Sequence, residues 1–217
     1  MITYFELRLT AILTMTLDHI GYMIFPSNIS LRLIGRIAFP IFAFGIAEGI
    51  KYTRNYQKYL LRLLIIALIS EVPFDLMTSD TICSFNSSNV MFTLLSGACL
   101  CCFMRFKLPT AEKIIFTLIP ILSVIMNCDY NIIGISVIPI MYYFITKGKP
   151  ATGALISCLL LTLCFGLWQL PCFFSAYLIS QYNGKREEKT LTTPFKITNY
   201  LFYPAHILLI YTISKIV

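Results

Sequence analysis

Ionisable side chains interrupt several of the most apolar stretches of this 217-residue sequence. A charge in the middle of a membrane helix costs about 2.5–3.5 kcal/mol, so each such group requires a partner, a wet cavity or a chemical task. His19 and His206 are the only histidines of the chain. Because imidazole titrates near neutral pH, both predict general-base or proton-relay chemistry. The alternative for each is a packed, hydrogen-bonded histidine. The other groups are Asp18, Arg36, Glu48, Glu71 and Asp75.

Helical spacing places two sets of these polar side chains on common faces. Glu71 and Asp75 are four positions apart and share one helix face. Asn199, Tyr203 and His206 follow the spacing i, i+4, i+7 and share another. Such polar faces are expected to turn toward protein rather than lipid.

Asp18 and His19 are neighbours in sequence, so on a helix their side chains point about 100° apart. We therefore expect Asp18 to pair with Arg36 of the next helix, either as a structural ion pair that fixes helix packing or as part of a site. We expect His19 to be oriented from a third helix, by Glu71 or Asp75.

The composition determines the class of protein that must position these groups. Hydrophobic residues make up 58% of the chain and charged residues 12%, which excludes a soluble globule and a disordered chain. The net charge of +7 comes from short basic clusters between apolar runs, a pattern typical of membrane topology rather than of nucleic-acid binding.

Apolar runs of spanning or near-spanning length predict an all-α polytopic membrane protein with about nine transmembrane helices, within a range of eight to ten. Two runs, 114–127 and 170–182, are short and carry or adjoin Pro120 and Pro171, so a re-entrant or broken segment is expected near 151–182. The runs are 9–25, 31–50, 60–78, 90–106, 114–127, 131–146, 151–168, 170–182 and 200–217.

Basic residues alternate between the predicted loops. The second, fourth, sixth and eighth loops carry Lys and Arg, whereas the third, fifth and seventh carry none. The positive-inside rule then places the N-terminus and the even loops in the cytoplasm. The first helix contains Asp18 and His19 and no cleavage site follows it, so we expect it to be retained. A single integral-membrane domain, 1–217, is predicted.

Motifs for other chemistries are absent. The sequence contains no Walker loop, GxGxxG, HExxH or GxSxG pattern, and Gly35 and Gly45 are interpreted as close-packing positions. Among the eight cysteines, Cys99 and Cys102 have CxxC spacing but lie in an apolar run, so we expect no metal site and a structural role for most of the cysteines.

Five sequence blocks resemble the TraX family. They are LTMTLDHIGYMIFP at 13–26, LRLIGRIAFPIFAFGIAEG at 31–49, YTRNYQKYLLRLLIIALISEVPFDL at 52–76, YNGK at 182–185 and FYPAHILLIY at 202–211. The family is named for a conjugative-plasmid protein that acetylates the N-terminus of the F-type pilin subunit. It is similar to multi-span acyltransferases that use acyl-CoA inside the membrane.

The resemblance implies an acyltransferase of the bacterial inner membrane that takes acetyl from acetyl-CoA to an amine or hydroxyl, with the acceptor open. Its partners would be membrane lipid, acyl-CoA and that acceptor, and no nucleic acid. General-base work, or an acetyl-histidine route, is assigned to His19 and His206 with Asp18, Glu71 and Asp75. Substrate and oxyanion contacts are assigned to Arg36, Tyr203, Asn89 and Glu48, with an interfacial structural role as the alternative for Glu48. The CoA phosphates are assigned to Arg54, Lys58, Arg62 and Lys185, which the topology rule also explains. A small-solute or proton-coupled transporter and a non-catalytic membrane assembly factor remain as alternatives.

Overall fold

A computed structural model describes residues 1–84, 86–184 and 193–216, and for 193–200 the backbone alone. Within these residues the fold is all-α, and the two isolated β-bridges join Ile2 to Tyr182 and Ser88 to Cys128. The helices are α1 (Tyr4–Met23), α2 (Ile29–Gly35), α3 (Ala38–Tyr52), α4 (Tyr56–Ser79), α5 (Val90–Arg105), α6 (Thr110–Ile125), α7 (Asn131–Thr146), α8 (Pro150–Phe165), η1 (Leu167–Gln169), α9 (Cys172–Ser180) and α10 (Thr193–Ser214).

Each predicted apolar run contains helix, but the second run is divided. The chain passes from α2 to α3 through a tight turn in which the amides of Arg36 and Ile37 bond to carbonyls three residues back. Pro40 explains the break, since proline has no N–H to donate to the Arg36 carbonyl and its ring displaces that carbonyl. The run predicted over 31–50 therefore forms two helices, α2 and α3, and the break between them lies at Arg36, a predicted site residue.

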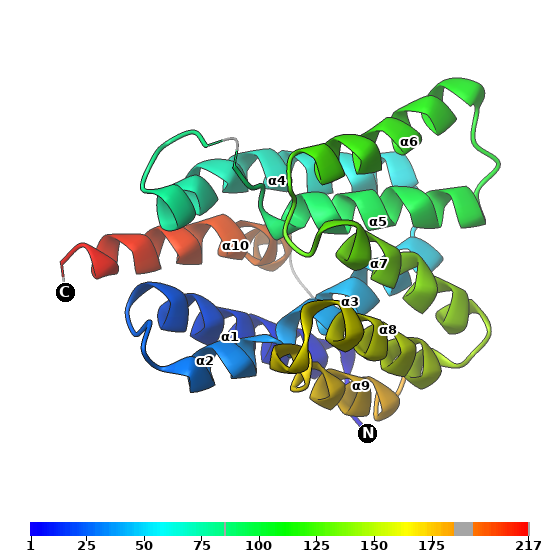
Figure 1. Cartoon of the computed structure of the whole chain (residues 1–217). Coiled ribbons are helices and arrows are strands. Elements are labelled where there is room, and N and C mark those ends of the chain that lie inside the picture. Colours follow the sequence, from blue (N-terminus) through cyan, green and yellow to red (C-terminus); the bar gives the residue numbers. More distant parts are fainter. Residues whose placement is uncertain (85, 185–192, 217) are drawn as a thin grey trace.

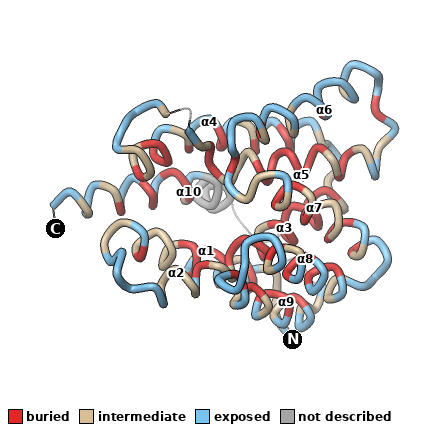
Figure 2. The backbone as a smooth tube through the Cα atoms, viewed as in Figure 1, coloured by how far each residue is buried: buried red, intermediate tan, exposed pale blue. Residues whose placement is uncertain are grey.

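Helix α3 lies at the centre of the molecule. It packs against α1, α5, α7, α8 and α9. Helices α4, α5 and α6 lie together on one side, and α10 runs along α4 and touches α1 (Figure 1). Burial follows this order: every residue of α3 from Ala38 to Ile50 except Phe42 is buried (Figure 2). The central helix thus has protein on all sides.

The connecting loops gather at two ends of the molecule. Loops 53–55, 106–109 and 147–149 lie at one end, and loops 24–28 and 80–89 lie at the other (Figure 1). The three basic loops that the structure describes therefore share an end, as the alternation of charge predicts.

Among the described residues, length and apolar character together single out one helical stretch able to cross a membrane, Ile29–Tyr52. Shorter apolar helices account for Val90–Arg105, Asn131–Thr146, Pro150–Phe165, Leu167–Ser180 and Leu201–Ser214. A helix of 16 residues such as α5 is about 24 Å long, below the roughly 30 Å of a bilayer core.

The segment after α8 is broken, as expected near 151–182. Gly166 ends α8 with φ of +83°, a conformation that favours glycine, and η1 then leads to Pro171. Helix α9 contains nine residues, so it is about 13 Å long.

Candidate functional site

The two histidines meet between α1 and α10. Nδ1 of His19 lies 2.8 Å from Nε2 of His206, and the rings are nearly parallel with centroids 5.0 Å apart. His206 is buried and His19 is half-buried. Tyr203 completes the group, its ring centroid 6.3 Å from that of His19.

A backbone carbonyl fixes the tautomers of this pair. Nδ1 of His206 lies 2.7 Å from the carbonyl oxygen of Phe202. Because a carbonyl only accepts, the proton of neutral His206 lies on Nδ1 and its Nε2 accepts from the Nδ1–H of His19. Neutral His19 is then left with its lone pair on Nε2. That nitrogen is the free base of the pair.

Two arginines hold Asp18 beside the histidines. Arg32 donates to Oδ2 of Asp18 at 2.9 Å, and the guanidinium of Arg36 lies 3.5 Å from Oδ1. The predicted pairing of Asp18 with Arg36 is therefore present, and Arg32 makes the shorter contact. Gly35 permits this approach, because a Cβ there would lie 2.3 Å from the Cβ of Asp18. The interpretation of Gly35 as a close-packing position is confirmed.

Tyr130 extends the site from the loop between α6 and α7. Its hydroxyl accepts from Arg36 at 3.4 Å, and its ring stacks on Phe39 with centroids 4.0 Å apart. Tyr130 has a φ of +61°, which is rare for a tyrosine and costs of order 1–3 kcal/mol. The strained residue thus places a hydroxyl next to the arginine.

Apart from His206, which contacts the cavity residue His19, these groups line one cavity of about 210 Å³, called here the histidine cavity. Its polar lining residues are Asp18, His19, Tyr22, Arg32, Arg36, Thr78, Asp129, Tyr130 and Tyr203, and Met15, Phe39, Phe42, Phe74, Met77, Val90 and Leu94 are among the apolar ones. Arg32 and Arg36 also border a second space lined by Phe165, Trp168 and Gln169, called here the Trp168 cavity. The two arginines therefore line both cavities.

The predicted catalytic carboxylates Glu71 and Asp75 lie outside the histidine cavity. The carboxylate of Glu71 accepts from the amide N–H of Asn89 at 3.2 Å and from its side chain. Asp75 accepts from the N–H of Ser84 at 2.9 Å. The expectation that Glu71 or Asp75 orients His19 was therefore wrong, because these carboxylates hold the chain that enters α5, and His206 is the partner of His19.

Asn89 has a structural place at the start of α5. Its side-chain oxygen accepts from the N–H of Met91 at 2.9 Å, and its amide donates to the carbonyl of Ala67 and to Glu71. This is the geometry of a helix N-cap. Because both amide hydrogens are engaged, Asn89 is not placed to stabilise an oxyanion.

The predicted phosphate-binding residues lie at the start of α4 or beyond the described part. Arg54, Lys58 and Arg62 are exposed, and Arg62 donates to the carbonyl of Lys58 at 3.0 Å. Lys185 and the side chain of Asn199 lie outside the described residues. Glu48 is buried in α3 and lines neither cavity.

Sequence reasoning missed Tyr130 and Asp129, and it gave Arg32 no role in the site. Arg32 had a signal, its spacing one turn before Arg36. Tyr130 and Asp129 sit in a short loop with no periodicity, so no pattern in the sequence marked them.

The fold and the site define an all-helical protein whose apolar helices enclose a histidine pair beside two arginines and an aspartate. The family model described as TraX protein matches residues 5–214. The chain belongs to the TraX family.

Two relatives add context to this assignment. The chain is 29% identical over 238 residues to the probable fimbrial assembly protein FimC, serogroup H1, of Dichelobacter nodosus, covering 95% of this chain and 93% of the relative. It is 25% identical over 154 residues to the uncharacterized protein RP591 of Rickettsia prowazekii (strain Madrid E), covering 70% of this chain and 58% of that protein. No solved structure matches the chain.

Proposed function

We propose that this protein is an integral-membrane acyltransferase that moves an acetyl group from acetyl-CoA to an amine or a hydroxyl. The observation that carries the proposal is the 2.8 Å contact between His19 and His206 at a cavity that also holds Arg32 and Arg36. Acyl transfer needs a base for the attacking group and cationic or N–H donors for the oxyanion. The histidine cavity brings both together.

The histidine pair supplies the proton transfers. The acceptor nitrogen or oxygen forms a bond to the acetyl carbonyl carbon while its proton passes to Nε2 of His19. The tetrahedral intermediate collapses, the carbon–sulfur bond breaks, and the leaving thiolate takes a proton from the imidazolium. The contact from Nδ1–H of His19 to His206 stabilises the positive charge between these steps.

The oxyanion is assigned to the arginine side of the cavity. Arg36 and the hydroxyl of Tyr130 lie 3.4 Å apart and both line the space next to His19. A guanidinium keeps its charge at all relevant pH values and donates through a rigid fork. Asp18 then acts as a positioning residue, since it fixes both arginines rather than the histidines.

Apolar side chains on the outside of the molecule support a multi-pass membrane location. In α6, Phe116 and Ser123 are the buried residues (Figure 2). Its exposed apolar side chains are Ile114, Ile115, Leu118, Ile121, Leu122 and Ile125. A helix this apolar on its outer side requires lipid or another protein surface. We assign it to the bacterial inner membrane, with the basic loops and the N-terminus in the cytoplasm.

The acceptor is proposed to enter through the Trp168 cavity. Arg32 and Arg36 line this space as well as the histidine cavity, whereas His19 lines the histidine cavity alone. Within the described part of the chain, Oε1 of Gln169 is buried and has no hydrogen-bond partner. An acceptor amine would satisfy it. Because one relative is named for fimbrial assembly, the N-terminal amine of a filament subunit is the first acceptor to test.

Thioester turnover tests the proposal. Purified protein in nanodiscs is incubated with acetyl-CoA labelled in the acetyl group and an N-terminal filament-subunit peptide, and free CoA and acetylated peptide are measured. The expected result is release of CoA matched by peptide acetylation. Adjoining cavities would also suit a transporter, which would move solute across vesicles and form no CoA-dependent product. No CoA release with any amine or hydroxyl acceptor would overturn the enzyme.

A further inference from the structure

A third cavity adjoins the histidine cavity. It has a volume of about 150 Å³ and shares Met15, Phe42, Val90, Leu94 and Tyr203 with the histidine cavity. Its far part is lined by Tyr4, Arg8, Ile12, Gly45, Tyr59 and Leu63. We call it the Arg8 cavity. Because the two spaces share five lining residues, they adjoin.

Single faces of α1 and α4 line both spaces. Along α1 the lining positions are 4, 8, 12 and 15 in the Arg8 cavity and 15, 18, 19 and 22 in the histidine cavity. Along α4 they are 59, 63 and 66 in the first and 74, 77 and 78 in the second. Spacings of three and four keep residues on one side of a helix. The path therefore runs along the helices.

The chemistry of this path changes from one end to the other. Arg8, Tyr4 and Tyr59 place a cation and two hydroxyls at the far end, whereas Ile12, Ile41, Ile46 and Met91 make the middle apolar. A ligand with an anionic end and a mainly apolar arm bearing a few amides matches this order.

The length of the path also restricts the length of the ligand that can bind in it. From Arg8 to His19 the helix rises about 17 Å at 1.5 Å per residue. An extended 4′-phosphopantetheine arm has about 13 bonds between phosphorus and sulfur, and at about 1.2 Å per bond of extended chain it reaches about 15 Å. A thioester at the end of such an arm would lie beside His19 when its phosphate is beside Arg8.

We propose that the Arg8 cavity binds the 4′-phosphopantetheine arm of the acyl donor, with the phosphate at Arg8 and the thioester at His19. The inference rests on the proposed acyltransferase function. It places the phosphate of the donor at Arg8 of α1 and not at the basic loop residues that the sequence indicated. Arg8 and Tyr4 belong to the N-terminal end of α1, which lies at the end of the molecule with the basic loops (Figure 1). CoA and an acyl carrier protein share this arm.

Adjacent positions on α1 provide a matched test. Ile12 lines the cavity, whereas Leu13 is 56% exposed on the outside of the helix. Binding of CoA to protein in nanodiscs is measured for Ile12→Trp and Leu13→Trp. We expect Ile12→Trp to weaken CoA binding by at least about tenfold and Leu13→Trp to leave it unchanged, since a bulky group fills the path in the first variant alone. Equal affinity of both variants would overturn the proposal.

A milder pair of variants guards against misfolding. Ile12→Cys and Leu13→Cys are made in a background without other cysteines and treated with N-ethylmaleimide. CoA is expected to slow alkylation at position 12 and not at position 13. Alkylation at position 12 that ignores saturating CoA would overturn the assignment.

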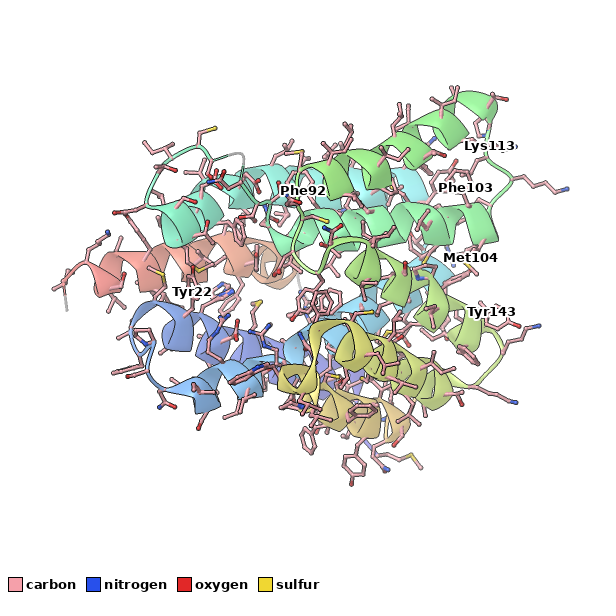
Figure 3. All side chains as sticks on the ribbon, in the orientation of Figure 1. Tyr22, Phe92, Phe103, Met104, Lys113 and Tyr143 are labelled. Carbon is pink, nitrogen blue, oxygen red and sulfur yellow. The ribbon has the colours of Figure 1, made fainter. Side chains whose placement is uncertain are left out.

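The phosphate contact has its own test. Arg8→Gln is expected to weaken binding of CoA by about tenfold or more and to leave binding of pantetheine, which lacks the phosphate, unchanged. Lys113→Gln is the control, because Lys113 is exposed on α6 and lies across the molecule from Tyr22 of the histidine cavity (Figure 3). Equal loss for both ligands would contradict a phosphate at Arg8. Acetyl-CoA and an acetylated acyl carrier protein are then compared as donors, and the donor that supports transfer identifies the source of the arm.

The experiments distinguish an error in the proposed donor site from an error in the proposed acyltransferase function. If the unaltered protein transfers acetyl and Ile12→Trp does so equally, the donor site is wrong and the acyltransferase stands. If CoA binds and protects position 12 but no acceptor is acetylated, the site is right and the proposed reaction is wrong. A protein that does not bind CoA, pantetheine or carrier protein overturns both.

Discussion

His19 and His206 are 187 positions apart in sequence, and their imidazole nitrogens lie 2.8 Å apart. No carboxylate orients either ring among the described contacts; the chain of hydrogen bonds ends at the carbonyl of Phe202. A carbonyl does not titrate in the range where proteins are stable. The tautomer of the pair is therefore fixed by backbone geometry rather than by a second acid.

The first prediction follows from the direction of that chain. His19→Ala and His206→Ala are each expected to lose about 10²-fold or more in acetyl transfer, the range for loss of a general base or its support. His206→Gln is expected to recover part of the loss, because its side-chain oxygen accepts from Nδ1–H of His19. His19→Gln has no such recovery. Transfer rates are measured alongside thermal unfolding in detergent, and full activity of both alanine variants would show that the site is wrong.

The second prediction concerns the ion pairs of Asp18. Their side chains are 19–33% exposed, so the coupling is expected to be about 1–2 kcal/mol rather than the 3–5 kcal/mol of a fully buried pair. Double-mutant cycles with Asp18→Asn are measured against Arg32→Gln and Arg36→Gln. The shorter contact predicts the larger coupling for Arg32. Additive losses in both cycles would refute the pairing.

The third prediction uses the close approach of α1 and α2. Gly35→Ala is expected to destabilise the protein by about 1–3 kcal/mol and to displace Asp18, because the new Cβ would lie 2.3 Å from the Cβ of Asp18. Gly45→Ala is the comparison. Its Cβ would meet the hydroxyl of Tyr4, the movable end of a side chain, at 2.8 Å. Equal unfolding free energies for the two variants would contradict the packing described.

The fourth prediction concerns orientation in the membrane. Cys83 is exposed in loop 80–89 and serves as a native reporter in a background without other cysteines. An impermeant maleimide is expected to label Cys83 in intact spheroplasts. It is expected to label the Lys107→Cys variant only after the membrane has been permeabilised. The same orientation places 51–59 and 183–199 in the cytoplasm. Labelling of Cys83 from the inside would reverse the topology.

The fifth prediction concerns the end of α10. Asp80 accepts from Lys215 and Tyr211 at 2.9 and 2.6 Å, and these hydrogen bonds, Lys215 first, lower the pKa of Asp80. A lowered folded-state pKa means that the contact stabilises the protein above the ordinary aspartate pKa of about 3.9 and is lost as the pH falls through the folded value. Asp80→Asn is expected to reduce hydrogen-exchange protection of 211–215 at pH 7.

The pH series provides the check for this last change. Protection in the unaltered protein should begin to fall below pH of about 4 and reach that of Asp80→Asn only below the lowered pKa of Asp80, and about 1 M salt should reduce the difference at pH 7. Thr81→Ala is the control, because Thr81 is exposed and follows Asp80 in the sequence. A difference that persists at low pH would exclude the carboxylate as its cause.

The helices were predictable because apolar runs report their lengths directly. The break at Arg36 was also within reach, since Pro40 removes a hydrogen bond at a known offset. Counting about 1.5 Å per residue from the cytoplasmic ends of the predicted spans places both histidines about 12–16 Å deep, near one level. Their contact still required knowing that α10 lies against α1, which no local pattern of the sequence specifies.

The errors in the site have a common physical source. Glu71 and Asp75 share a helix face, but that face meets the chain before α5, where their oxygens accept from Asn89 and Ser84. A polar face shows that a helix turns toward protein and not which protein group it meets. Tyr130 lies in a loop, and a loop has no periodic pattern of apolar and polar residues from which its contacts could be predicted.

The single face of α1 that lines both cavities restricts where this chain tolerates insertions and deletions. One residue added between Arg8 and Asp18 would turn everything before it by about 100° relative to the rest of the helix. Arg8 would then leave the cavity while Asp18 and His19 stayed. Seven added residues would make almost two turns and restore the face, although the path would lengthen by about 10 Å. The number of residues between Arg8 and His19 therefore has to match the distance between the phosphate and the thioester of the proposed ligand.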